Sequence, residues 1–229
     1  MKRNILLFIV LIACFWQLGG ALLYMTAFGH TAVAPWMFGF TKLFMISIPF
    51  IALTIGWKAG RFFKGASWKD IVLGLGFGIL FFLIMIGIFH FFPTALSKAF
   101  VDAGPRAQAF GIATPGVFII ASILFSLIHS LFEEFYWRWF VFGAMQLFTH
   151  RPIAIVLSGL AFSLHHVIVL LAFTTPVMAV LFGLMIGAVG SLWALLYIRQ
   201  GNIVSPWISH IFADLAIAMI GYLVLFGVN

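Results

Sequence analysis

The sequence predicts an all-α protein, a polytopic bundle of transmembrane helices, and its composition and apolar runs support this fold class. Hydrophobic residues make up 65% of the 229 residues and charged residues only 7%, and the mean hydropathy is +1.22. A water-soluble domain cannot hide so much apolar surface, because it still needs a polar exterior. Apolar runs of about 20 residues recur along most of the chain, which is the length that a helix needs to cross a bilayer. The short alternating segments of a membrane β-barrel are not evident.

The apolar runs predict about seven spans in a single membrane domain, residues 1–229, at approximately 5–27, 36–57, 71–92, 117–147, 152–173, 176–198 and 203–227. The first run is longer than the roughly 7–15 residues of a signal-peptide core, so we expect a retained first helix. The fourth is too long for a simple crossing, and we expect it to be tilted, to protrude or to include a re-entrant piece. Gly183 and Gly187 form a small-xxx-small pair in the sixth span, which favours close helix packing.

The positive charges predict the orientation in the membrane. They are dispersed beside apolar runs, so the net charge of +7 indicates topology signals rather than a nucleic-acid surface. The positive-inside rule puts the N-terminus and the loops of the same parity in the cytoplasm of a multi-pass protein of the cell membrane. With seven spans the C-terminus is outside, whereas an eighth, missed helix would reverse that point. The loop residues that decide this parity are Lys2, Arg3, Lys58, Arg61, Lys64, Lys69, Arg151 and Arg199. Pro93 to Gly116, with Lys98, Asp102 and Arg106, is expected to be an outside loop.

Three of the five acidic side chains lie inside apolar runs, where ionisable groups are costly and indicate a functional site. Glu134 and Arg138 are one helical turn apart, so we expect them to pair and to neutralise each other. Glu133 projects about a quarter-turn away and is free for another role. Two adjacent carboxylates in different environments are typical of an acid/base site, although a structural polar cluster would also fit.

Two later spans add histidines. His166 shares a helix face with Phe162, and His210 is one turn before Asp214. Together with the two glutamates, these residues can activate a water and stabilise an oxyanion.

Three motifs in this order, Glu-Glu-x-x-x-Arg, Phe-x-x-x-His and His-x-x-x-Asp, resemble the CPBP family of intramembrane peptidases, named for CAAX proteases and bacteriocin-processing enzymes. The resemblance covers roughly residues 117–227. It implies a helical-bundle endopeptidase acting on a membrane-anchored protein or peptide in the bilayer, and we expect no cofactor. The roles that it implies are base and partner for Glu133 and His166, orientation for Glu134 and Arg138, and the oxyanion side for His210 and Asp214. Asp214 would be either protonated there or used to orient His210.

Neighbouring residues have simpler interpretations. His165 points about 100° away from His166, so we expect a packing or supporting role. His129, one turn before Glu133, is expected to pack although it is able to reach the water. Lys42 is the lone charge near the start of the second span and is expected to extend to the membrane interface.

Other functions remain open at this point. Glu133, His166, His210 and Asp214 have the ligand types of a zinc site, but the sequence has no His-Glu-x-x-His motif, so metal-free hydrolysis is favoured. A transporter or proton relay also uses intramembrane acids and histidines, yet no internal repeat is evident. The third alternative is an inactive scaffold or immunity protein that retains the fold. No nucleic-acid partner is expected.

Overall fold

The structure is a computed structural model that describes residues 2–58, 60, 62–92 and 99–227. Arg61 and Lys98, two of the loop charges that bear on the membrane orientation, lie outside the described residues. Within these ranges the secondary structure is helical, with no strand, so the predicted all-α class is confirmed. Seven helices or joined helical segments are long and apolar enough to cross a membrane, which confirms the multi-pass bundle.

The observed spans begin and end within a few residues of the predicted ones, since hydropathy marks the buried length of a membrane helix directly. They are α1 (Lys2–Ala21) continued by the π-helix η1 (Leu22–Ala27), α2 (Ala34–Thr54), α3 (Trp68–Phe91), α5 (Pro115–Glu134) continued by the π-helix η3 (Phe135–Phe142) and α6 (Gly143–Met145), α7 (Arg151–Leu171), α8 (Pro176–Gln200) and α9 (Val204–Phe226).

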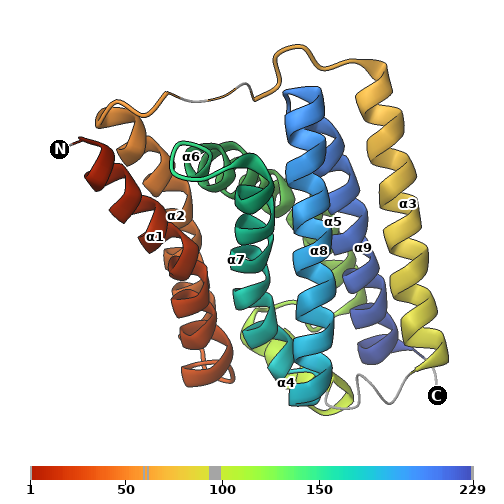
Figure 1. The fold of residues 1–229 in the computed structure, drawn as a ribbon. Helices are drawn as coiled ribbons and strands as arrows, with labels where there is room; N and C mark the ends of the chain where they lie inside the picture. Colours follow the sequence, from red (N-terminus) through yellow and green to blue (C-terminus); the bar gives the residue numbers. More distant parts are fainter. Residues whose placement is uncertain (1, 59, 61, 93–98, 228–229) are drawn as a thin grey trace.

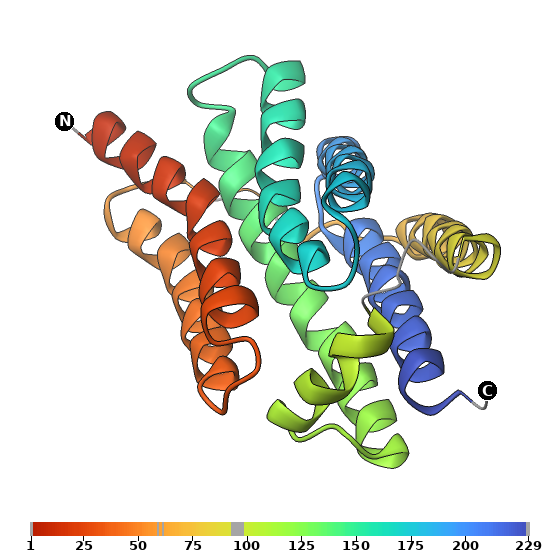
Figure 2. The same cartoon turned by 90° about the horizontal axis from the view of Figure 1, so that it is seen from below.

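The fourth span is one continuous helical path from Pro115 to Met145, 31 residues long. At about 1.5 Å per residue it exceeds the roughly 30 Å of bilayer hydrocarbon. It lies obliquely across the bundle in the view from below (Figure 2). Of the three expectations for this span, tilt therefore fits, and the chain makes no re-entrant turn there.

A short helix, α4 (Ala99–Ala109), occupies the segment that we expected to be a loop. Eleven residues are too few to cross a bilayer, so hydropathy does not detect this helix. Its Arg106 holds it on the bundle, because Nη1 donates to the carbonyl oxygens of Met25 at 3.2 Å and Gly29 at 3.4 Å. The guanidinium also lies 5.6 Å from the ring centroid of Phe173.

The bundle has a centre and two flanks (Figures 1 and 2). The central helices are α5, α7, α8 and α9, while α1 and α2 pair on one side and α3 lies on the other. The most extensive contacts are between α7 and α8 and between α3 and α9. The N-terminus and C-terminus are at opposite ends of the bundle, as an odd number of spans requires (Figure 1).

The connection from α2 to α3 crosses over the end of the bundle that carries the N-terminus (Figure 1). Trp139 Nε1 donates to the carbonyl oxygen of Gly60 at 2.8 Å. The backbone N–H of Ile203 donates to the carbonyl oxygen of Phe62 at 3.0 Å. These bonds fix the connection on η3 and on the start of α9.

Glycines allow α7 and α8 to approach closely. A Cβ at Gly187 would lie 3.2 Å from both the carbonyl oxygen of Gly159 and the Cβ of Ser163. A Cβ at Gly183 would collide with the side chain of Val167. The predicted use of this glycine pair for close packing is therefore confirmed.

Gly187→Val should destabilise the bundle by about 1–3 kcal/mol, the usual cost of overpacking a filled interface. Gly76→Val is the matched control, because a Cβ there meets no atom within 4 Å. Thermal unfolding of both variants in detergent is the measurement. Equal losses would show that the α7–α8 contact does not depend on the missing side chain.

Candidate active site

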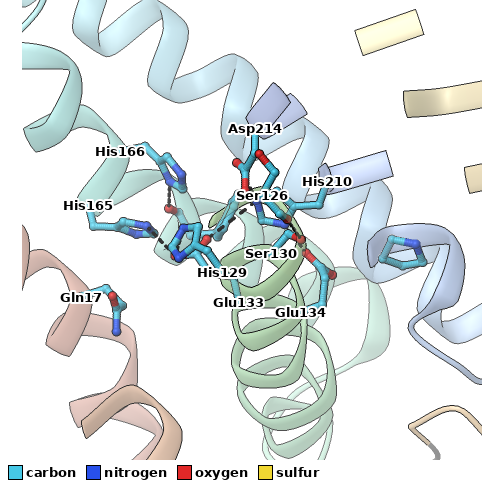
Figure 3. Close-up of polar contacts among 12 residues, drawn as sticks. Gln17, Ser126, His129, Ser130, Glu133, Glu134, His165, His166, His210 and Asp214 are labelled. Atoms are coloured by element: carbon cyan, nitrogen blue, oxygen red, sulfur yellow. Dashed lines mark hydrogen bonds and ion pairs between the residues drawn. The ribbon is translucent and has the colours of Figure 1, made fainter. Parts of the chain in front are cut away.

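Buried polar side chains from several helices converge in the middle of the bundle (Figure 3). Helix α5 contributes Glu133 and Glu134, both fully buried, and η3 contributes Arg138. The remaining polar groups come from α7, with His165 and His166, from α9, with His210 and Asp214, and from α1 and α2, with Gln17 and Lys42. The six residues that the sequence singled out are Glu133, Glu134, Arg138, His166, His210 and Asp214, and they lie within this one cluster.

The two oxygens of Glu133 have different surroundings. Oε1 accepts a hydrogen bond from Lys42 Nζ at 2.9 Å. It also lies 3.4 Å from Nε2 of His129 and 3.6 Å from Nε2 of His165. Oε2 faces Nε2 of His210 at 3.9 Å and has no hydrogen-bond partner among the described residues. Oε1 is thus bound by the ammonium of Lys42, while Oε2 faces the imidazole of His210 on α9.

Glu134 forms the ion pair expected from the sequence. Its Oε2 lies 3.2 Å from Nε of Arg138, an ion-pair distance without hydrogen-bond geometry. The guanidinium is 2% exposed, and its Cζ lies 4.5 Å from the ring centroid of Phe162 and 4.8 Å from that of Trp193. The arginine is therefore enclosed between one carboxylate and two aromatic faces.

The helix changes from α to π geometry directly after the two glutamates, at Phe135. Segments of π-helix are rare and are frequent at functional sites. Here the wider turns begin directly after the glutamates and themselves carry the buried aromatic side chains of η3. The i,i+4 pair of Glu134 and Arg138 is kept across this junction.

Glu134, rather than Asp214, holds His210. Nδ1 of His210 forms a 2.8 Å hydrogen bond with Oε1 of Glu134. Its Nε2 lies 3.7 Å from Oδ1 of Asp214, beyond hydrogen-bond distance. The ring stacks on Trp193 with centroids 4.4 Å apart. Because Nδ1 is engaged by Glu134, Nε2 is the nitrogen that faces Glu133.

His166 is close to Glu133 without a direct bond to it. Its Nδ1 donates to the carbonyl oxygen of Phe162 at 2.9 Å, which leaves Nε2 as the acceptor nitrogen of a neutral ring. One ligand atom each of Glu133, His165 and His166 lie within 4.8 Å of one another. A single water can bridge groups at that separation, since each hydrogen bond spans about 2.7–3.0 Å.

Three neighbours are closer to Glu133 than the sequence suggested. Lys42 does not extend to the membrane interface, because its ammonium is bound by Glu133 and by Gln17. His165 is 3% exposed, and its Nε2 lies 3.6 Å from Oε1 of Glu133, so it contacts the carboxylate instead of only packing beside His166. His129 stacks on Phe125, as expected for packing, yet its Nε2 also reaches the carboxylate.

Orphaned polar atoms mark the same place. Glu133 Oε2, His165 Nδ1 and Asp214 Oδ2 are buried and have no hydrogen-bond partner among the described residues. Buried polar atoms in proteins are nearly always paired with protein, water or ligand. The cluster therefore has donors and acceptors for a further polar molecule, as a hydrolytic site needs for water and a peptide carbonyl.

Comparison with known families agrees with this geometry. Residues 115–216 match the family model of type II CAAX prenyl endopeptidase Rce1-like proteins. The match runs from the start of α5 into α9 and includes all six residues singled out from the sequence. Neither the curated proteins nor the solved structures gave a significant match. Within this multi-pass membrane protein, residues 115–216 are therefore similar to the Rce1-like family of CAAX proteases.

Proposed function

We propose that the protein is an intramembrane endopeptidase that hydrolyses a peptide bond of a membrane-anchored protein or peptide with a water activated by Glu133. The observation that carries the proposal is the buried Oε2 of Glu133, which has no hydrogen-bond partner in the described part of the chain and faces His210 in a cluster of acids and histidines. The similarity of residues 115–216 to the Rce1-like family favours the same chemistry.

In the proposed mechanism Glu133 Oε2 takes a proton from a water that His166 helps to orient. The water oxygen attacks the peptide carbonyl, and negative charge develops on the carbonyl oxygen. A general base within reach of its water contributes about 10²–10⁴-fold to such a reaction. The protonated Glu133 then gives its proton to the amide nitrogen as the C–N bond breaks and the oxyanion re-forms a carbonyl in the new carboxyl group. This restores the Glu133 carboxylate and releases the amine.

His210 is proposed to stabilise the oxyanion. When the ring carries both protons, Nδ1 donates to Glu134 at 2.8 Å and Nε2 is free to donate toward the site. Donors fixed before the reaction are effective in a site that excludes water, because they need no reorganisation. Arg138 and the rings around it hold Glu134, and through it His210, in place. Asp214, 3.7 Å from Nε2, is proposed to orient the same ring from the other side.

Zinc-dependent hydrolysis is the second candidate, because the ligand atoms of Glu133, His165 and His166 lie within 4.8 Å of one another. Carboxylate and imidazole groups are zinc ligands. A fixed cation argues against it, since the ammonium of Lys42 is 2.9 Å from Oε1 of Glu133 and would repel a divalent ion there. Metal-free catalysis is therefore the stronger proposal.

The proposed orientation places the N-terminus in the cytoplasm of a cell-membrane protein. Helices α3 and α7 begin, and α8 ends, at the end of the bundle that carries the N-terminus (Figure 1). That end accordingly collects positive side chains of the α2–α3 connection and of the adjoining helix ends, Lys58, Lys64, Lys69, Arg151 and Arg199. This asymmetry supports the positive-inside assignment.

Purified protein in liposomes should cleave a fluorogenic peptide anchored by a farnesylated C-terminal CaaX cysteine, and cleave the peptide without its lipid much more slowly. The reason is that the proposed site lies within the membrane-spanning part of the bundle, where only an anchored substrate is concentrated. Peptide cleavage is followed by fluorescence and the cut bond by mass spectrometry.

A strong chelator should leave this activity unchanged. Inactivation by the chelator and recovery with added zinc would replace the metal-free mechanism by the zinc mechanism. Absence of cleavage of this peptide and of a transmembrane reporter would favour a transport, scaffold or immunity role instead.

A further inference from the structure

Lys42 brings a cation to the candidate base from outside the segment that matches the protease family. It lies on α2, whereas the family match begins at residue 115. Its Nζ donates to Oε1 of Glu133 at 2.9 Å and to Oε1 of Gln17 at 3.2 Å. The ammonium also lies 5.5 Å from the ring centroid of Phe38. The lysine is thus surrounded by an anion, an amide oxygen and an aromatic face.

The pairing has a physical cause. A lysine and a glutamate at membrane depth are each costly, and each becomes tolerable when it neutralises the other. The side chains of Lys42 and Glu133 are 13% and 1% exposed. The neighbouring acid, Glu134, already has Arg138 as its counter-ion. Lys42 is therefore the cation that balances Glu133.

Gln17 fixes the lysine from the opposite helix. It is fully buried on α1, and its Oε1 is the second acceptor of the ammonium. Two hydrogen bonds hold this helix pair in register with the site. Trp16 Nε1 of α1 donates to the carbonyl oxygen of Thr41 on α2 at 3.0 Å. Tyr136 Oη of η3 donates to the carbonyl oxygen of Ala13 on α1 at 2.7 Å.

The lysine also distinguishes the two oxygens of Glu133. Oε1 is engaged by Nζ at 2.9 Å, with two histidine nitrogens at 3.4 and 3.6 Å on the same side. Oε2 has no hydrogen-bond partner within the residues that the structure describes, and it is directed at His210. A carboxylate anchored through one oxygen cannot rotate freely, so the oxygen available to a water is Oε2.

We propose that Lys42, supported by Gln17, is a positioning residue of the active site that keeps Glu133 as a carboxylate and directs its Oε2 to the reacting water. The proposal rests on the proposed function of Glu133 as the base. It makes α1 and α2 part of the catalytic unit, although the family motifs lie on α5, η3, α7 and α9 alone.

The pH dependence of catalysis tests this role. The charged and titratable groups around Glu133 are Lys42 of α2, His129 and Glu134 of α5, Arg138 of η3, His165 and His166 of α7, His210 and Asp214 of α9, and the tyrosines Tyr24 of η1 and Tyr136 of η3. Removal of the ammonium leaves Glu133 without its closest cation, so the carboxylate binds a proton more readily. The acidic limb of kcat/KM should then move to higher pH, because a protonated Glu133 is not a base.

Lys42→Met should therefore lower kcat/KM at neutral pH by at least tenfold and recover part of the loss at alkaline pH. A shift of one pH unit in the acidic limb corresponds to about tenfold below that limb. Lys42→Arg keeps the cation and should keep the wild-type limb, while Gln17→Leu should shift it in the same direction as Lys42→Met but less. Lys64→Met is the control for loss of a lysine, because Lys64 is exposed in the connection between α2 and α3. An unshifted limb in folded Lys42→Met would overturn the proposal.

Two further measurements do not depend on hydrolysis. If Lys42→Met fails to fold, the double variant Lys42→Met/Glu133→Gln should restore folding, because both partners are then neutral; no restoration contradicts the pairing. Infrared difference spectra against Glu133→Gln report the carboxylate band of Glu133 directly. That band should be present at neutral pH in the wild type and diminished in Lys42→Met. If the wild-type protein shows this band but cleaves no peptide, the proposed function is refuted and the pairing stands. If the enzyme is active but its band does not depend on Lys42, only the positioning role is refuted.

Discussion

Glu133→Gln should lower hydrolysis of a membrane-anchored peptide by about 10²–10⁴-fold, the usual contribution of a general base. Glutamine has nearly the same shape but cannot accept the proton of the water. Its amide oxygen can still accept a hydrogen bond from the ammonium of Lys42, so the half-buried lysine keeps a partner. The loss should therefore reflect chemistry, and kcat/KM of purified, folded protein in liposomes is the measurement.

A second variant shows whether Glu133 acts together with the histidine on α7. His166→Ala should lose activity in the same range, because its ring is within one water of the carboxylate. Combining it with Glu133→Gln should cost much less than the product of the two separate losses, since residues that act as a unit are non-additive. Full additivity would separate His166 from the base. Robust activity of folded Glu133→Gln would refute the assignment of the base.

The membrane spans could be predicted from the sequence because burial in lipid needs a run of apolar residues, and such runs are directly visible. The same signal misses α4, a short helix of mixed composition outside the spans. That helix depends on the contacts of Arg106 with the end of the first span and with the turn after it. Contacts between segments about 80 residues apart are tertiary, and hydropathy does not contain them.

Some relations among the six candidate site residues could be predicted, because helical periodicity pairs Glu134 with Arg138 and places each histidine one turn from its motif partner. How one helix is turned relative to another could not be predicted from periodicity. Periodicity separates His165 from His166 by about 100°, yet α7 turns toward α5 with both histidines near Glu133. One signal for Lys42 was available: an intramembrane lysine with no acid on its own helix needs one elsewhere, and few acids lie in apolar runs.

Because buried charges need partners, substitution of the two glutamates should differ in its effect on the free energy of unfolding. Glu134→Gln should destabilise the folded protein by about 3–5 kcal/mol, the cost of leaving one partner of a buried ion pair uncompensated. Arg138 cannot lose its proton, is 2% exposed and lies against the rings of Phe162 and Trp193, so its charge would stay buried without a counter-ion. The substitution also removes the carboxylate that holds Nδ1 of His210 at 2.8 Å.

Glu133→Gln should destabilise the protein less than Glu134→Gln does. Its counter-ion has a flexible side chain that is 13% exposed, and Gln17 remains as an acceptor. Free energies of unfolding in detergent, with expression level as a second measure, compare the two variants. The double variant Glu134→Gln/Arg138→Met is the matched control, because removing both charges should return part of the lost stability even though the hydrogen bond to His210 is changed. Equal losses for the two single variants, or no recovery in the double variant, would mean that the Glu134–Arg138 pair does not stabilise the site as the geometry indicates.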